Sequence, residues 1–180
     1  MIRIQTKQLE LVALDIPCMQ LYVTDRDQLV RSLGLKPYRQ FIEPLYQKEI
    51  DEAMPVFARK LEQNPQDYPW YSAWEIVLTA EQIAIGGIGF AGPPDEKGNI
   101  TLGYHICKRY WSKGLTSEAA AGILEWAFGN EAVKTITAYT PVEHIASQKV
   151  LLKNGFTKIR QEMQEGMAVF IFKKSRMQAK

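Results

Sequence analysis

The sequence predicts a mixed α/β fold, with about four helices flanking a central mixed sheet of about six to seven strands. Three observations support it. Helical patterns dominate before Pro69, strand patterns rich in aromatic and β-branched residues follow it, and helices alternate with strands beyond residue 106. The expected order of elements is β-α-α-β-β-β-α-β-α-β-β. The 180 residues contain no repeat or low-complexity linker, so we expect a single domain over 1–180.

The first third is expected to contain a strand and two helices. Residues 11–23 begin with the alternation of side chains that is typical of a strand. The next segment, TDRDQLVRSLG, offers Thr24 or Asp25 as the N-cap of a helix and Gly34 as its end. A second helix follows, and Pro55 could break it.

Three strands should form an antiparallel meander after Pro69, because turn signals such as GPPDEKGN separate them. They span 70–78, 82–92 and 99–106. The remaining elements are expected in the order helix, strand, helix, strand, strand, at 116–128, 133–139, 141–154, 156–163 and 167–172.

The helix expected at 141–154 carries signals at both ends. Thr140 suits its N-cap, Pro141 its first position, and Glu143 can complete a capping box. Gly155 can end the helix in the left-handed conformation, with Phe156 making the hydrophobic contact.

Composition excludes several classes of protein. The net charge is +2, from 22 basic and 20 acidic residues, which leaves no large positive field for nucleic acid. No apolar run approaches the roughly 20 residues that span a bilayer, and the start resembles no signal peptide, so we expect a cytoplasmic protein without a membrane partner. Cys18 and Cys107 match neither a metal-ligand spacing nor a disulfide framework, so we expect buried thiols and no metal site.

The segment YWSKGLTSEAAAGILEWAF places a glycine directly before a helical pattern. Gly114 lets the backbone turn tightly, and the free amides from Ser112 to Thr116 would form a nest that attracts an anion such as phosphate. The pattern is neither a Walker loop nor a dinucleotide GxGxxG. The alternative is a plain strand-to-helix turn.

Two segments together carry a family resemblance: LGYHICKRYWSKGLTSEAAAGILEWAF and AYTPVEHIASQKVLLKNGF. They resemble the two central motifs of the GNAT superfamily of acetyl-CoA-dependent N-acetyltransferases, in the branch of the ribosomal-protein N-terminal acetyltransferases RimJ and RimL. The similarity is clear over about 86–156, which would be the CoA-binding half of the domain. It implies the GNAT fold and acetyl transfer from acetyl-CoA to an amine.

The resemblance also implies how acetyl-CoA would bind. In such proteins the amides after the fourth strand hold the pyrophosphate of CoA, while that strand pairs with the pantetheine arm and supplies an oxyanion donor. By position, the pyrophosphate role falls to Trp111, Ser112, Lys113, Gly114, Leu115 and Thr116. The strand role falls to Tyr104, His105 and Ile106.

Several positions depart from the family pattern. Thr116 stands where glycine or alanine is usual and narrows the loop. His144 replaces an asparagine that commonly faces pantetheine, and Leu151 replaces the tyrosine that many relatives use to protonate the departing thiolate. No glutamate occupies the middle of the NITLGYHI strand, where some relatives carry a base.

Other residues could supply the missing catalytic groups. Ser147, one helical turn before Leu151, could protonate the thiolate; alternatively its hydroxyl bonds back to the preceding turn. His144 could contact pantetheine or relay a proton, because the beginning of a helix disfavours imidazolium. Glu75, in the neighbouring strand, could act as the base through a water molecule. His105 faces either the core or a ligand.

The acceptor amine is left open between a small molecule and a protein N-terminus. In this fold its pocket is usually built by the first two helices and the late strands, here 29–71 and 156–172. If the acids of that region line the pocket, a cationic amine or a basic peptide terminus would suit it. These acids are Glu43, Glu49, Asp51 and Glu52. A homodimer is compatible with the sequence.

Three functions remain open at this point. The first is an acetyl-CoA-dependent N-acetyltransferase. The second is a CoA-binding regulator without turnover, which the leucine at 151 and the missing strand glutamate would explain. The third is a scaffold in which Gly114 is only a turn.

Overall fold

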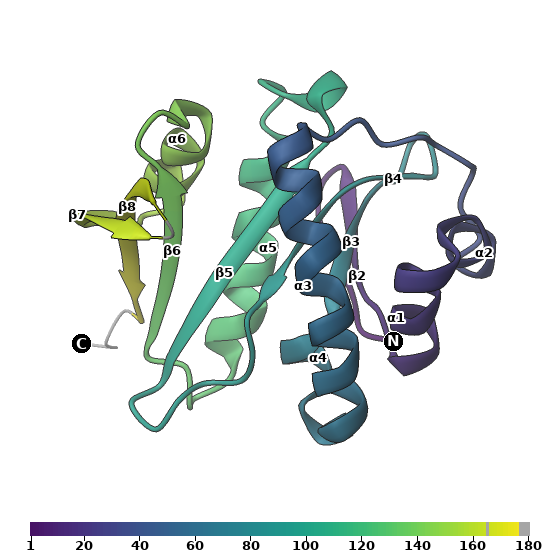
Figure 1. Cartoon of the computed structure of the whole chain (residues 1–180), viewed down its shortest axis with the longest axis horizontal. Coiled ribbons are helices and arrows are strands. Elements are labelled where there is room, and N and C mark those ends of the chain that lie inside the picture. Colours follow the sequence, from purple (N-terminus) through teal and green to yellow (C-terminus); the bar gives the residue numbers. More distant parts are fainter. Residues whose placement is uncertain (165, 177–180) are drawn as a thin grey trace.

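A computed structural model describes residues 1–164 and 166–176 (Figure 1). Within these residues the strands form one eight-stranded sheet with the order β1-β2-β3-β4-β5-β6-β8-β7. The strands are β1 (Arg3–Gln5), β2 (Leu9–Ala13), β3 (Ala73–Leu78), β4 (Ile83–Phe90), β5 (Asn99–Ile106), β6 (Thr135–Pro141), β7 (Thr157–Gln164) and β8 (Met167–Ser175). Neighbouring strands are antiparallel except β5 and β6, which are parallel.

Helices cover both faces of the sheet. They are α1 (Ile16–Thr24), α2 (Arg26–Ser32), α3 (Pro44–Gln63), α4 (Tyr68–Tyr71), α5 (Leu115–Gly129) and α6 (Ile145–Lys153). Short 3-10 turns lie at Pro65–Asp67 (η1) and Lys108–Tyr110 (η2).

Two hydrophobic cores lie on opposite faces, because alternate residues of a strand point to opposite sides. Leu11 of β2 packs in the core that contains Ile123 of α5. Its neighbour Val12 packs in the second core, with Leu29 of α2 and Leu61 of α3. Helices α1 to α3 therefore cover the face opposite α5, and Figure 1 shows α3 and α5 on the two sides of the sheet.

The parallel strands β5 and β6 pair only at their beginnings. The paired positions are Asn99 with Thr135, Ile100 with Ile136, and Thr101 with Thr137. Both strands continue beyond these pairs and diverge toward the end of the sheet where α5 and α6 begin (Figure 1). The backbone of β5 after residue 101 is consequently left without a strand partner on the β6 side.

The predicted mixed α/β class and the antiparallel meander β3-β4-β5 are confirmed. The predicted strand at 11–23 is wrong beyond Ala13. Asp15 accepts a hydrogen bond from the backbone N–H of Cys18 at 3.1 Å and begins α1 there. Strand β1 and helix α4 were not predicted, so the sheet has more strands than expected.

Helix ends were predicted with mixed success. Asp25 caps α2 through the N–H of Gln28 at 2.8 Å, and α3 continues through Pro55. The predicted start of the last helix at 141 is wrong, because Thr140 and Pro141 pair with β8 and extend β6. Helix α6 begins only at Ile145.

The end of α6 is as predicted. Gly155 has φ +77°, and the N–H of Phe156 donates to the carbonyl of Leu151 at 3.1 Å. In the part of the chain that the structure describes, no helix is both long and apolar enough to cross a membrane.

Candidate active site

A cavity of about 1620 Å³ opens where β5 and β6 separate. The diverging halves of these two strands line it, together with the turn before α5, the beginning of α6 and one side of α3. It therefore connects the two faces of the sheet through the split. Pockets at a split in a sheet that contains parallel strands are common sites for ligands in α/β proteins.

The turn before α5 presents backbone N–H groups without protein partners. Ser112 and Gly114 both have left-handed φ values, +60° and +78°. Gly114 is the N-cap of α5, so no side chain caps this helix. Among residues 1–164 and 166–176, no group accepts a hydrogen bond from the amides of 112–117. Such amides at the positive end of a helix dipole suit an anionic ligand such as phosphate.

The turn before α5 is held in place at the end of β5 and is open on its outer side. The indole N–H of Trp111 donates to the carbonyl of Ile106 at 2.9 Å, which fixes the turn to the end of β5. A Cβ added at Gly114 would have no atom within 4 Å, so the space above the turn is free of protein. Thr116 lines the cavity in the first turn of α5.

His144, at the N-cap of α6, contacts a residue from the opposite wall. Its Nδ1 lies 3.2 Å from the hydroxyl of Tyr46 on α3, and the two rings stack with centroids 5.4 Å apart. Burial lowers the pKa of His144, which favours a neutral imidazole. Burial, with the charges of nearby glutamates, raises the pKa of Tyr46, so its hydroxyl stays protonated.

Ser147 and Tyr104 meet across the cavity between α6 and β5. Their hydroxyl oxygens are 2.9 Å apart, and the Tyr104 hydroxyl also lies 3.2 Å from the Ser147 carbonyl as a donor. Burial raises the pKa of Tyr104 to about 12, although the hydrogen bond with Ser147 opposes this shift. Both groups are therefore neutral hydroxyls near pH 7.

Thr140 is a polar residue buried in the wall of the cavity. It is 1% exposed, and its Oγ1 has no hydrogen-bond partner among the described residues. A buried hydroxyl without a partner is uncommon and costs free energy. A polar group of a bound molecule could supply the missing partner.

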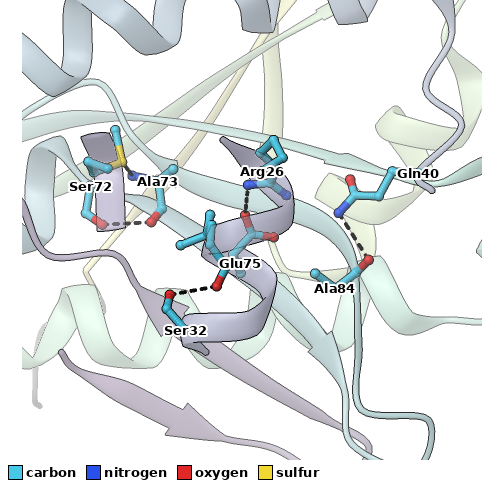
Figure 2. A network of polar contacts seen from close by, with 9 residues as sticks. Arg26, Ser32, Gln40, Ser72, Ala73, Glu75 and Ala84 are labelled. Carbon is cyan, nitrogen blue, oxygen red and sulfur yellow. Dashed lines mark hydrogen bonds and ion pairs between the residues drawn. The ribbon is translucent and has the colours of Figure 1, made fainter. Parts of the chain in front are cut away.

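Glu75 lies in β3 and is not among the residues that line the cavity. It is 2% exposed and forms an ion pair with Arg26 of α2 (Figure 2). Gly87 lies between Glu75 and His105 in the register of β3, β4 and β5. A Cβ at Gly87 would stand 2.6 Å from Cε1 of His105, so the imidazole occupies the space that glycine leaves.

His105 lines the cavity as a neutral group. Burial, and secondarily the positive charge of Arg26, lower its pKa to about 4. Among residues 1–164 and 166–176, no cluster of three or more His, Cys, Asp or Glu residues could hold a metal ion.

Comparison with known proteins identifies the family. A family model described as an acetyltransferase (GNAT) domain matches residues 17–157. The chain belongs to the GNAT acetyltransferase family. A relative of this GNAT chain in Bacillus subtilis (strain 168), named uncharacterized N-acetyltransferase YjdG, is 32% identical over 156 residues, which are 87% of this chain and 90% of the relative.

Solved GNAT structures share the fold at low identity. One is the ribosomal L7/L12 α-N-protein acetyltransferase RimL in complex with coenzyme A, with TM-score 0.67, 17% identity and coverage of 97% and 98% of the two chains. Another is the ribosomal-protein-S5-alanine acetyltransferase from Vibrio fischeri, with TM-score 0.66, 14% identity and coverage of 97% of both chains. The predicted similarity to the RimJ and RimL branch is thus supported at the level of fold.

The structure of this GNAT chain brings most of the predicted site residues to one cavity. Those that line it are Tyr104, His105, Ile106, Trp111, Ser112, Gly114, Thr116, His144 and Ser147. Lys113 and Leu115 were expected to act through their backbone amides. The side chain of Leu115 is in the core, and the Lys113 amine lies 5.0 Å from the ring centre of Tyr110. Only Glu75 is withdrawn from the cavity by a side-chain partner.

Sequence reasoning did not identify Tyr46 and Thr140 as residues of the cavity. Tyr46 lies within the region 29–71 expected to build the acceptor pocket but was not singled out, and Thr140 was expected to be a helix cap. The exception in the motif at His144 could have indicated a new partner for that side chain. No local pattern identifies Tyr46 as this partner, since 98 residues separate the two.

Proposed function

We propose that this protein transfers the acetyl group of acetyl-CoA to a primary amine, either of a small molecule or at a peptide N-terminus. One observation carries the proposal: the unpartnered amides before α5 and the split between β5 and β6 belong to the same cavity. The amides suit a pyrophosphate, and the split suits an extended arm that leads from it. Family membership agrees with this chemistry.

The described residues fit CoA in three respects. The amides from Ser112 to Thr116 would donate to the pyrophosphate, with Gly114 leaving room for its approach. Backbone N–H groups of β5 that face the split would pair with the pantetheine arm, as a strand added to the sheet would. The hydroxyl of Thr140 would gain the partner that it lacks.

Acetyl-CoA supplies the acetyl group as a thioester. The amine nitrogen forms a bond to the carbonyl carbon, the carbon–sulfur bond breaks, the amine loses one proton and the sulfur gains one. We assign the proton for sulfur to the Ser147 hydroxyl, which Tyr104 positions at 2.9 Å. Water would accept the proton that the amine loses, and a proton from water would restore the Ser147 hydroxyl. A backbone N–H in the segment from Tyr104 to Ile106 would stabilise the carbonyl oxygen as negative charge develops on it.

His144 has a different role in this proposal. The Tyr46 hydroxyl is protonated and lies 3.2 Å from Nδ1, so it can donate to that nitrogen. The imidazole would then carry its proton on Nε2 and donate to the pantetheine arm, as an asparagine amide can. A proton relay through His144 remains the alternative to Ser147.

The position of Glu75 favours a second candidate function. Its carboxylate is buried against Arg26, so the glutamate that could have served as base is withdrawn from the cavity. A protein with this arrangement could bind CoA and regulate through that binding without turnover. The two functions differ in a single measurement, the release of free thiol.

The test uses the full chain with acetyl-CoA. Thermal unfolding with and without acetyl-CoA reports binding, and a thiol reagent reports CoA release in the presence of a panel of primary amines. We expect CoA-dependent stabilisation and amine-dependent thiol release. Stabilisation without release for every amine would favour the regulator. No stabilisation by any acyl-CoA would contradict both functions and leave a scaffold.

A further inference from the structure

One side of α3 lines the cavity on the face of the sheet opposite α5. The residues of this side, which we call the α3 stripe, are Tyr46, Ile50, Ala53, Met54 and Phe57. Their spacing along the helix puts them on one face. Each is half-buried, and Ile50, Ala53 and Met54 belong to neither hydrophobic core among the described residues. The stripe therefore leaves apolar surface toward the cavity.

The α3 stripe faces the side of the cavity that CoA would leave open. The amides for the pyrophosphate stand before α5, whereas α3 covers the other face of the sheet (Figure 1). The split between β5 and β6 connects the two faces. An acceptor that approaches along α3 would meet the acetyl group at this split.

The carboxylates near the stripe do not offer a cation a free partner. Glu43 binds Lys108 with a nitrogen–oxygen distance of 2.9 Å, and Glu52 lies 3.7 Å from Lys48 at the exposed rim. Glu49 is also engaged in an interaction. Glu43, Glu49 and Glu52 do line the cavity, but each already has a partner, so a cation bound beside them would have to compete with that partner.

The opposite wall also disfavours a positive charge. His105 on this wall fills the space beside Gly87, and burial lowers its pKa to about 4, so its imidazole is neutral. Glu75, which could have offset a cation, is occupied by Arg26. Burying an ammonium group without a carboxylate partner is costly, whereas burying hydrocarbon is favourable.

We propose that the α3 stripe is the acceptor pocket and that it takes a primary amine carrying an apolar or aromatic side group rather than a polycationic amine. This inference rests on the proposed acetyl transfer. The apolar surroundings also favour the uncharged form of the reacting amine, which is the form that attacks a thioester. The pocket would in this way reduce the need for a dedicated carboxylate base.

The experiment compares acceptors with the wild-type chain and acetyl-CoA. The probes are 2-phenylethylamine, ethanolamine, spermidine, and two short peptides that begin with Phe or Ser. We expect kcat/KM at least about tenfold higher for 2-phenylethylamine than for ethanolamine or spermidine. The peptides identify the source of the apolar group: preference for the Phe peptide over the Ser peptide supports the same pocket in a peptide acceptor.

A matched pair of variants on α3 tests the location. Met54→Glu puts a charge into the stripe, while Val56→Glu puts the same charge on the same helix at a side chain that is 46% exposed and outside the cavity. We expect Met54→Glu to lower kcat/KM for 2-phenylethylamine at least about tenfold, with acetyl-CoA binding unchanged. Val56→Glu should match the wild type. Met54→Gln, uncharged and of similar length, replaces Met54→Glu if that variant does not fold.

The outcomes separate this inference from the proposed function. Equal or better transfer to spermidine or ethanolamine overturns the apolar pocket but leaves acetyl transfer standing. Equal effects of Met54→Glu and Val56→Glu overturn the location. Absence of transfer to every amine overturns both.

Discussion

Replacing Gly114 by alanine separates the folding role of the turn before α5 from its role in binding. Gly114 has φ +78°, a conformation that costs a residue with a Cβ roughly 1–2 kcal/mol. The added methyl group would meet no atom within 4 Å, so backbone strain is the whole expected loss of folding free energy. Gly34 provides a matched control, because it has φ +71° and equally open surroundings but lies outside the cavity.

The effect on CoA binding should differ between the two variants. At Gly114 the methyl group stands beside amides that would donate to the pyrophosphate, and each hydrogen bond to a charged group contributes about 1.5–3 kcal/mol. Losing one of them lowers CoA affinity at least about tenfold, since 1.4 kcal/mol corresponds to a factor of ten. We therefore expect Gly114→Ala to bind CoA at least about tenfold more weakly than Gly34→Ala, at similar stability.

Urea unfolding measures the two stabilities, and isothermal titration calorimetry measures CoA affinity at a temperature where both variants are folded. Equal CoA affinity for both variants would refute the assignment of this turn to pyrophosphate. A loss of stability well above 2 kcal/mol in Gly114→Ala alone would show that the turn is needed for packing, which contradicts the open surroundings of the residue.

Three further predictions address the cavity. Ser147→Ala should lower kcat by roughly tenfold to ten-thousandfold while the affinity for acetyl-CoA stays nearly unchanged. The loss of kcat should be smaller at high pH, where the thiolate can leave without a proton. If Ser147→Ala keeps full kcat and His144→Asn loses it, His144 is the group that supplies the proton. His105 has a pKa of about 4 in the folded chain, whereas a histidine in the unfolded chain has a pKa of about 6.5. Between these two values the unfolded chain binds the proton and the folded chain does not, so the wild type should lose about 1–2 kcal/mol of folding free energy from this group between pH 7 and pH 5. Urea unfolding of His105→Gln should lack that loss, and an unchanged pH dependence would refute the assignment. Thr140→Val should raise the free energy of unfolding by about 1 kcal/mol because it removes an unpaired buried hydroxyl, and a fall in urea midpoint would show that the hydroxyl has a partner after all.

Local sequence signals predicted the elements whose causes are local. The glycine at 114 stands at the N-cap of α5 and the glycine at 155 follows the end of α6, both with positive φ, because only short-range sterics decide these positions. The meander also followed from side-chain alternation and turns. These parts of the fold depend on residues close together in the chain.

Tertiary pairing overrode local signals at the beginning of α6. Thr140, Pro141 and Glu143 form an acceptable helix start by sequence, yet the first two of them continue β6. Pairing with Phe170 and Val169 of β8 adds strand hydrogen bonds and burial that a capping box does not provide. The stabilisation that one helix cap provides is smaller than the stabilisation from a continuous series of strand pairs.

The sequence by itself determined the family motifs, the glycine turn before α5 and nine of the residues that line the cavity. Only the tertiary structure decided that Glu75 pairs with Arg26, that Tyr46 reaches His144, and that Glu43 at the start of α3 pairs with Lys108. The reason is physical. A turn is fixed by the dihedral angles of a few consecutive residues, whereas the charge and partners of a side chain depend on groups 49 or 98 positions away that only the folded chain brings into contact.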